Sequence, residues 1–414
     1  MATTISASRR RIIARACPKP RVLGNRWTGR GPGTRTAAAR AGRRGGRDCP
    51  IAASASAAKS EELTEAWMSA VDSPSEEAVV TLDLSLGEAE CARLMAAAAE
   101  RGVGFFRLEG TGIPAEELEN FLALHSDFFR QDASLKDRFR AKSKLQEPMG
   151  YRNAQVDGTK VDASFQTEPC FRECFELGKK RTVGDLHGLE TSGDEDDYLW
   201  LDDPSAAAAA AAAFDVSDFK ERMESYHGKA FALSRRLHRV VALSLGLPAN
   251  DFDKYYERPL DFLLLNHYPP TVRDPSVGHL GLGAHCDFAF TTLLLTDGVE
   301  GLQICKDKTR PEGEREWVTV PFEGEPAFVV NFGDALECLS NGRCVSVLHR
   351  VANISNKERR SAAFFCEPSA DATIVPLVQP GEERKFQGIP NYKAYIEAKF
   401  KSIGSFGKPF EADE

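Results

Sequence analysis

From Asp261 onward the chain is a succession of short β-type segments separated by turn residues. Eight segments follow one another at intervals of about ten to twenty residues with no helical pattern between them, namely DFLLLNHY, FTTLLL, GLQIC, EWVTV, AFVVNF, CVSVL, SAAFFC and ATIVP. Strands of this number and spacing predict a double-sheet jelly roll, an architecture that can carry a metal inside its mouth. The charged stretch KDKTRPEGERE, residues 306–316, is expected to form a long hairpin loop.

An α/β portion is expected before the jelly roll. The segments VVTLDLS (79–85) and VGFFRL (103–108) are strand-like, and EAECARLMAAAAERG between them is rich in helix formers and stops at Gly102. Pro114 opens a second helical stretch, PAEELENFLALHSDFFRQ. The pattern therefore predicts strand, helix, strand and helix in that order.

The middle of the chain has few periodic signals. Residues 141–213 hold many turn residues and end in Ala206–Ala213, which we interpret as a low-complexity insertion at a loop or helix start. A long amphipathic helix, suited to brace a sheet, is predicted from Asp218 to Leu245. The expected fold class is mainly β with flanking helices: a double-stranded β-helix (jelly-roll) core with an N-terminal α/β portion. The expected domains are 1–58 outside the fold, 75–213 as the α/β portion, and 214–414 as the bracing helix, jelly roll and C-terminal helix.

Charge separates the first 58 residues from the rest. They contain twelve Arg and one Lys against Asp48, a net charge of +12, and because the whole chain totals −8 the remainder carries −20. An Arg-, Ala- and Ser-rich, acid-poor N-terminus is typical of an organelle transit peptide, with cleavage expected between Asp48 and Lys59. A chloroplast is favoured and a mitochondrion is the alternative. A basic disordered arm that binds nucleic acid is the competing interpretation of this segment.

The remainder of the composition excludes several classes of partner. A body with a charge of −20 repels nucleic acid and anionic membranes, and no run of 18 or more apolar residues is present to span a bilayer. The ten cysteines are scattered with no CxxC pair, which indicates reduced thiols and neither a zinc site nor a disulfide framework. We expect a monomer that acts on a small molecule.

Three residues are candidates for a metal site. His285 and Asp287 stand two apart, so in a strand both side chains point to the same face. His349 follows the β-type segment CVSVL and can join them from a distant strand. Two imidazoles and one carboxylate on one face of an iron leave its opposite face open, as non-haem Fe(II) oxygenases require. Four other histidines lie in helical or loop stretches, with no carboxylate placed on the same face of a strand. We assign structural or solvent roles to them, namely His125, His187, His227 and His238.

A candidate anion site follows the second histidine of this set. Arg359 and Ser361 lie ten and twelve residues after His349, two apart at the start of a predicted strand. A guanidinium fork beside a hydroxyl is suited to bind a carboxylate through two charge-assisted hydrogen bonds. The alternative interpretation of KERR, a solvated charge run, is disfavoured by the fixed offset from His349.

The order of these motifs resembles the Fe(II)/2-oxoglutarate-dependent dioxygenases, in the isopenicillin N synthase-like branch that includes plant gibberellin, flavonoid and alkaloid oxygenases. The resemblance covers most of the chain after residue 75. It rests on His-x-Asp, His and Arg-x-Ser, on VVTLDLS with GVGFFRLEGTGIP, and on six later motifs in order: RECFELG, LNHYPP, GLGAHCD, DGVEGLQI, FVVNFGDALECLSNGR and SVLHRVAN.

The resemblance implies a role for each of these residues. His285, Asp287 and His349 would ligate Fe(II), and Arg359 and Ser361 would hold the distal carboxylate of 2-oxoglutarate. Tyr268 and Asn266 would assist them. O2 and 2-oxoglutarate would be consumed, with ascorbate as reductant, and the release of succinate and CO2 would accompany hydroxylation or desaturation of a small organic metabolite. Because Asp287 keeps a carboxylate at the third ligand position, halogenation is not expected.

The resemblance also implies which segments line the substrate pocket. These are the N-terminal strand region, a loop around Arg152, and the C-terminal helix near Tyr392 to Phe400, which together would give a mixed polar and aromatic wall. His267 stands where the branch often has Tyr, a change expected in that wall. The charged insert after Ile304 lengthens the interval between the ligands, which a surface hairpin would tolerate.

Two alternatives remain open. The first is a non-haem iron oxidase of the same fold that does not use 2-oxoglutarate, in which the Arg-x-Ser pair serves another carboxylate. The second is a non-catalytic jelly-roll binding module. Release of succinate and CO2 would distinguish a 2-oxoglutarate-dependent oxygenase from both of these alternatives.

Overall fold

A computed structural model describes residues 80–141, 149–162, 165–187, 194–201, 214–322 and 324–402. All of these residues fall in one compact unit, Pro50–Glu414. The expected transit segment 1–58 and the alanine run Ala206–Ala213 lie outside the described residues. The division of the chain at residue 213 stays a prediction.

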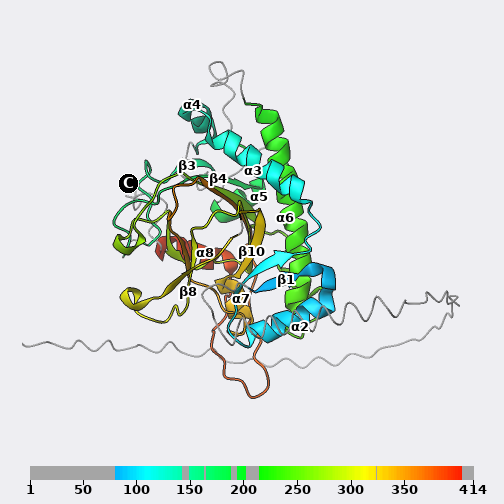
Figure 1. Cartoon of the computed structure of the whole chain (residues 1–414). Helices are drawn as coiled ribbons and strands as arrows, with labels where there is room; N and C mark the ends of the chain where they lie inside the picture. The colour runs from blue at the N-terminus through cyan, green and yellow to red at the C-terminus, as the bar shows by residue number, and fades with distance from the viewer. Residues whose placement is uncertain are drawn as a thin grey trace, which may run out of the picture. The chain divides into compact units, whose positions relative to one another are not determined.

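Two β-sheets form the core of the structure (Figure 1). The larger sheet has eight strands, and only its β1–β2 pair is parallel. Its members, in spatial order, are β1 (Thr81–Asp83), β2 (Phe105–Glu109), β10 (Ala327–Phe332), β7 (Thr291–Thr296), β12 (Arg359–Cys366), β5 (Phe262–Tyr268), β4 (Glu173–Gly178) and β3 (Gly150–Asn153). Strands from the expected α/β portion thus extend the jelly-roll sheet at both edges.

The smaller sheet is antiparallel and has four strands. In spatial order they are β6 (Leu282–His285), β11 (His349–Val351), β8 (Leu302–Cys305) and β9 (Trp317–Thr319). The segment between β8 and β9 contains the short 3-10 helix η7 (Glu312–Glu314) and is the charged hairpin loop that the sequence predicts. Two facing sheets that are antiparallel apart from the β1–β2 pair confirm the jelly-roll prediction.

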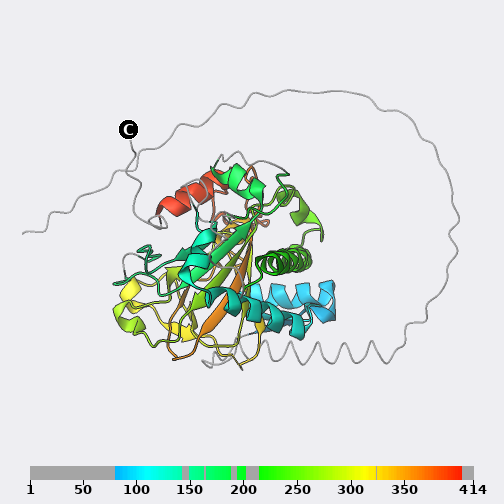
Figure 2. The same cartoon turned by 90° about the horizontal axis from the view of Figure 1, so that it is seen from above.

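Helix α6 (Val216–Ser244) braces the larger sheet, as predicted. Asp215 caps it, because one carboxylate oxygen accepts from the backbone N–H groups of Ser217 and Asp218 at 2.9 and 3.1 Å. The helix packs against β7 and β12 and against helix α2 (Glu88–Ala99), and Figure 2 looks down its axis with α2 beside it. One hydrophobic cluster joins its apolar face to the outer face of the sheet.

The remaining helices are short or lie at the edges. Helix α3 (Ala115–Phe129) matches its prediction and packs on α6 and β12. No helix in the described part of the chain is long and apolar enough to cross a bilayer. The others are α4 (Ala133–Lys136), α5 (Lys180–His187), α7 (Asp334–Leu339), α8 (Tyr392–Ser402), and the 3-10 helices η1 (Leu84–Leu86), η2 (Asp137–Phe139), η5 (Asp251–Tyr255) and η6 (Pro275–Val277).

Several local predictions are wrong. CVSVL is not a strand, because the Ser346 carbonyl accepts from Lys308 Nζ and the Ser346 hydroxyl donates to Asp334, although the Leu348 carbonyl accepts from the backbone N–H of Cys305 in β8. Strand β11 therefore begins at His349. ATIVP forms only a single bridge between Ile374 and Ile389. VVTLDLS is a strand over three residues only, and α7 interrupts a region expected to have no helix.

The middle of the chain is more regular than its sequence indicates. Residues 150–153 and 173–178 form the paired strands β3 and β4, and α5 follows directly. Strand β3 is only four residues long, so its side-chain periodicity is too brief to be read from the sequence. Its pairing with β4 is what makes it a strand.

Candidate active site

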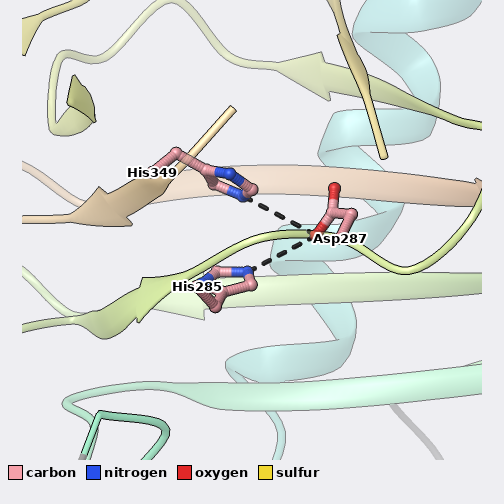
Figure 3. Close-up of side chains that lie close together, drawn as sticks. All are labelled: His285, Asp287 and His349. Atoms are coloured by element: carbon pink, nitrogen blue, oxygen red, sulfur yellow. Dashed lines mark ion pairs between the residues drawn. The ribbon is translucent and has the colours of Figure 1, made fainter. Parts of the chain in front are cut away.

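The three predicted metal ligands converge where the two sheets face each other (Figure 3). His285 ends β6 and His349 begins β11, and these two residues are cross-strand partners. Asp287 lies two residues beyond the end of β6, so its position depends on the turn after the strand and not on strand alternation. Its Oδ1 lies 3.5 Å from Nε2 of His285 and 3.7 Å from Nε2 of His349. The ligand atoms of all three residues lie within 4.8 Å of one another.

Backbone carbonyls fix the orientation of both imidazoles. Nδ1 of His285 lies 2.8 Å from the carbonyl oxygen of Gly283, and Nδ1 of His349 lies 3.0 Å from that of Val347. Because a carbonyl oxygen only accepts, each Nδ1 carries the proton and each Nε2 keeps its lone pair toward the shared space. Burial, together with the facing His349, lowers the pKa of His285 to about 4. His285 is therefore neutral at pH 7, as a metal ligand must be.

Two further side chains orient the carboxylate of Asp287. Its Oδ2 accepts hydrogen bonds from Thr292 Oγ1 at 2.5 Å and from Asn331 Nδ2 at 2.7 Å, which leaves Oδ1 for the imidazole side. Burial acts to raise the pKa of Asp287, but the two imidazoles and these two hydrogen bonds outweigh it and lower the pKa. One carboxylate oxygen and two imidazole nitrogens on one face fit Fe(II).

Sequence reasoning missed Thr292 and Asn331. Asn331 is the one amide in the apolar strand AFVVNF, and this is the signal that could have identified it. Thr292 sits in TTLLLT, where a threonine is also an ordinary strand residue, so nothing in its type identifies it.

The predicted anion site lies in the same cavity. Arg359 is 3% exposed, and its Nη2 is buried with no hydrogen-bond partner among the described residues. Its Nη1 donates to Ser361 Oγ at 3.4 Å, its Nε donates to the Val299 carbonyl at 3.3 Å, and its guanidinium lies over the Tyr268 ring at 5.1 Å. A buried, unpaired guanidinium nitrogen is costly. A carboxylate placed beside it would supply the missing acceptor.

Strands β5 and β12 place the assisting residues. Tyr268 pairs with Arg359 and Asn266 pairs with Ser361 across these strands. The side-chain oxygen of Asn266 already accepts from Arg172 Nη1, so its amide nitrogen is the group left for a ligand. All seven residues predicted for the site line one cavity. Its volume is about 1240 Å³, including the open solvent at its mouth.

The other walls of this cavity are mainly apolar. Helix α8 contributes Ile396 and Phe400, and β2 contributes Phe105, as the predicted pocket segments require. Arg152 also lines the cavity but lies in strand β3 and not in a loop. Three charged cavity residues were not predicted as site residues: Arg172, Glu176 and Glu367.

His267 does not alter the substrate wall, contrary to expectation. Its neighbours Asn266 and Tyr268 line the cavity, so strand alternation turns His267 to the opposite face. There its ring stacks on Phe129 and its Nε2 lies 3.0 Å from Glu358 Oε1. His267, which stands where the branch often has Tyr, therefore lies on the side of the larger sheet that the helices cover.

Three of the histidines assigned structural roles are buried among core side chains. His125 and His238 contact the Asn266 carbonyl and the Thr291 hydroxyl at 3.1 and 2.9 Å. His227 does have a carboxylate neighbour, since its Nε2 lies 3.5 Å from Asp261 Oδ2. The role of His187 stays a prediction.

The eight described cysteines are all free and seven of them are buried, consistent with the predicted reduced thiols.

Comparison with known proteins gives matches to both halves of the chain. A model of the 2OG-Fe(II) oxygenase superfamily matches residues 259–368, and a model of the N-terminal region of the non-haem dioxygenase in morphine synthesis matches residues 79–198. Gibberellin 20 oxidase 1 of Arabidopsis thaliana is 28% identical over 293 residues, which is 69% of this chain and 67% of that protein. The 2-oxoglutarate-Fe(II) type oxidoreductase ppzC of Metarhizium majus is 30% identical over 279 residues, which is 64% of this chain and 70% of that protein.

Solved structures show the same fold. The crystal structure of a full-length Neurospora crassa protein in complex with alpha-KG has a TM-score of 0.60 and 23% identity, and the match covers 80% of this chain and 98% of that one. The converging His, Asp and His, the fold and the sequence relatives agree, and the chain belongs to the 2OG-Fe(II) oxygenase superfamily.

Proposed function

We propose that this Fe(II)- and 2-oxoglutarate-dependent oxygenase hydroxylates or desaturates a small organic metabolite and releases succinate and CO2. One observation carries the proposal. The metal triad faces the same cavity as Nη2 of Arg359, which has no hydrogen-bond partner among the described residues. A metal ion would be bound by the triad, and the distal carboxylate of a dicarboxylic keto acid would accept from Arg359 Nη2.

The three metal-binding side chains and the Arg359–Ser361 pair each have a task in this function. Nε2 of His285, Nε2 of His349 and Oδ1 of Asp287 would hold Fe(II), while Arg359 and Ser361 would bind the distal carboxylate of 2-oxoglutarate. When bound, iron and 2-oxoglutarate together supply oxidative decarboxylation with O2 and an oxidant able to remove hydrogen from a C–H bond. The protein positions the target carbon and excludes water with its apolar walls.

The relatives support a small-molecule substrate. The Arabidopsis relative is named as a gibberellin oxidase, and the Neurospora structure is described as a complex with alpha-KG. We assign ascorbate as the reductant that keeps the iron ferrous, and we propose a monomer. Because Asp287 occupies the third ligand position with a carboxylate, hydroxylation or desaturation is favoured over halogenation.

We also propose that residues 1–58 are a transit peptide and that the mature enzyme works in the chloroplast. The charge of +12 on this segment, against −20 on the rest, supports the proposal. The mitochondrion is the alternative compartment.

The experiment that tests the function follows cosubstrate consumption. Purified protein is incubated with Fe(II), ascorbate, 2-oxoglutarate and a cell extract, and succinate, CO2 and consumed metabolites are measured. We expect one succinate and one CO2 for each metabolite oxidised. Metabolite oxidation that continues without 2-oxoglutarate would favour the oxidase without this cosubstrate, and the absence of any turnover would favour the binding module.

A further inference from the structure

Four titratable side chains of the cavity, those of Arg152, Arg172, Glu176 and Glu367, have no task in binding iron or 2-oxoglutarate. Arg152, Arg172 and Glu176 lie on or beside β3 and β4, at the edge of the larger sheet farthest from β7. Cross-strand pairing sets their place. Asn266 pairs with Cys174 and Cys174 with Arg152, while Leu264 pairs with Glu176. These groups therefore continue the inner face of the sheet away from Ser361.

Arg172 is a buried cation without a carboxylate partner. It is 4% exposed, its Nη1 donates to the Asn266 side chain, and its Nε has no hydrogen-bond partner among the residues that the structure describes. No carboxylate in the described part of the chain lies within 4.0 Å of its guanidinium nitrogens. Burying a guanidinium without a counter-ion is costly, so an anion at this point would stabilise it.

Arg152, in contrast, is already paired. Its Nη2 donates to Glu176 Oε2 at 2.7 Å, and Glu176 is 3% exposed. This contact fixes the guanidinium of Arg152 at the cavity wall and supplies one negative charge near Arg172. Burial nevertheless raises the pKa of Glu176 to about 7, so this charge is only partly present at neutral pH.

The charge balance of the cavity leaves a positive excess. Three arginines line it against three carboxyl groups, those of Glu176, Asp287 and Glu367, and burial raises the pKa of Glu367 to about 8, so that Glu367 is largely protonated at pH 7. Fe(II) and the 2-oxoglutarate dianion cancel each other. At least one positive charge therefore remains, beside Arg172 and Arg152.

We propose that Arg172, with Arg152 beside it, binds a carboxylate of the organic substrate, and that the substrate is a monocarboxylic acid with a mainly apolar skeleton. The inference rests on the proposed function and adds the substrate class. The skeleton lies on Leu264, Phe262 and Phe365, which line the cavity next to this charged edge. Arg359 takes the cosubstrate carboxylate and Arg172 takes the substrate carboxylate, so the two acids bind at separate cations.

The first test removes the carboxylate from the substrate. A cell extract is divided, and one half is treated with trimethylsilyldiazomethane in methanol to convert carboxylic acids to methyl esters. Each half is then offered to the Fe(II)-loaded full-length protein with fresh 2-oxoglutarate. We expect the untreated half to stimulate succinate formation and the esterified half to stimulate it at least ~10-fold less, because the ester offers no charge to Arg172.

The outcomes separate the two proposals. Equal stimulation by both halves overturns the acid assignment and leaves the oxygenase intact. No stimulation by either half overturns the proposed function, and the acid assignment with it. The consumed compound is then identified by mass spectrometry, where it must show the mass gain of one methyl ester in the treated half.

The second test assigns the carboxylate to Arg172. Arg172→Gln is expected to raise the half-saturating concentration of the identified acid by at least ~10-fold, and Arg172→Lys to recover part of this loss because it keeps the charge. The dissociation constant of 2-oxoglutarate in the Mn(II)-loaded protein should change by less than about threefold. Arg239→Gln is the matched control, since Arg239 pairs with Glu88 at the protein surface and should leave both values unchanged.

The opposite pattern would overturn the assignment. If Arg172→Gln weakens 2-oxoglutarate tenfold and leaves the acid unaffected, then Arg172 is a cosubstrate residue. Should Arg172→Gln fail to fold, Arg172→Lys and Arg152→Gln carry the same comparison, and an unchanged half-saturating concentration of the acid in both overturns the proposal.

Discussion

Asn331 donates a hydrogen bond of 2.7 Å to Oδ2 of Asp287 and thereby leaves Oδ1 facing the two imidazoles. Thr292 donates to the same Oδ2 at 2.5 Å. Without these donors the carboxylate could rotate, and the burial that raises its pKa would be less opposed. The two side chains therefore hold Asp287 ionised and in one orientation before any metal binds.

The first prediction concerns these two donors. Asn331→Ala and Thr292→Val should each lower Fe(II) affinity by about 10- to 100-fold, as is typical when a residue that orients a metal ligand is lost. Thr296→Val is the control, because Thr296 lies on the same strand and its buried hydroxyl has no hydrogen-bond partner within the described ranges of the chain. Metal titration measures the Fe(II) affinity of the three variants, which should be lower in Asn331→Ala and Thr292→Val than in Thr296→Val. Equal affinity in Thr292→Val and Thr296→Val would contradict the role of Thr292.

The second prediction concerns the ligands themselves. His349→Ala should abolish tight Fe(II) binding and turnover while the protein stays folded, because His349 occupies the edge of a cavity and not the core. His279→Ala, a change at a half-buried histidine near Glu168, should retain both. Metal content after dialysis and circular dichroism measure the two properties. Full activity in His349→Ala would show that the assignment is wrong.

The convergence of the candidate metal ligands was predictable because their chemistry resides in residue types that few other roles require. Two histidines and an aspartate at the mouth of a predicted barrel have few structural explanations. The orientation of these three side chains cannot be predicted from the sequence. Asp287 lies outside the strand, and its direction depends on Thr292 and Asn331 from β7 and β10, which only the folded sheet brings together.

The fold was predictable where segments are long and periodic, as in α3, α6 and β5. It was not predictable where tertiary contacts determine a short segment. Strand β3 exists because β4 pairs with it. CVSVL is not a strand, because its Ser346 carbonyl accepts from the Lys308 side chain of the β8–β9 hairpin and its Ser346 hydroxyl donates to Asp334 of α7. Arg172 was seen as part of RECFELG, but its missing counter-ion is visible only in the folded cavity.

The third prediction concerns targeting. A fusion of residues 1–58 to a fluorescent reporter should enter the chloroplast and appear shortened on a gel, because the import machinery removes such segments. A fusion in which the arginines of this segment are replaced by glutamine should stay outside. A wild-type fusion that remains cytosolic at full length would contradict the transit peptide.

The fourth prediction concerns the pH dependence of stability. Burial raises the pKa of Glu367 from 4.5 to about 8, and its carboxyl group contacts the Tyr392 hydroxyl of α8. Between these two values the folded state holds a proton that the unfolded state has lost. The free energy of unfolding should therefore fall as pH rises from 4.5 to 8, with a slope of up to about 1.4 kcal/mol per pH unit.

Glu367→Gln removes this titrating group and keeps a hydrogen-bonding side chain of similar size. Its free energy of unfolding should therefore show a shallower decline over the same pH range. Urea unfolding of the metal-free wild type and variant at pH 5, 6, 7 and 8 measures the difference. Parallel curves for the two proteins would show that Glu367 is ionised in the folded state.

The last prediction concerns the cosubstrate. Arg359 presents a planar fork whose Nη2 has no partner in the described part of the chain, and lysine at this position would give a point charge without the fork. Arg359→Lys should weaken 2-oxoglutarate by at least ~10-fold, and Ser361→Ala should cost less, about 1 kcal/mol, because it removes one hydrogen bond. Fe(II) affinity should hardly change in either variant, since neither side chain is among the three proposed metal ligands.

The neighbouring Arg360 provides the control for this prediction. Its guanidinium pairs with Asp297 at 3.0 Å and does not line the cavity, so Arg360→Lys should leave the affinity for 2-oxoglutarate unchanged. The measurement is the 2-oxoglutarate concentration that gives half-maximal succinate formation, together with the same value for the organic substrate. If Arg359→Lys altered only the value for the organic substrate, Arg359 would bind that substrate, and the non-haem oxidase that works without 2-oxoglutarate would be the better description of the enzyme.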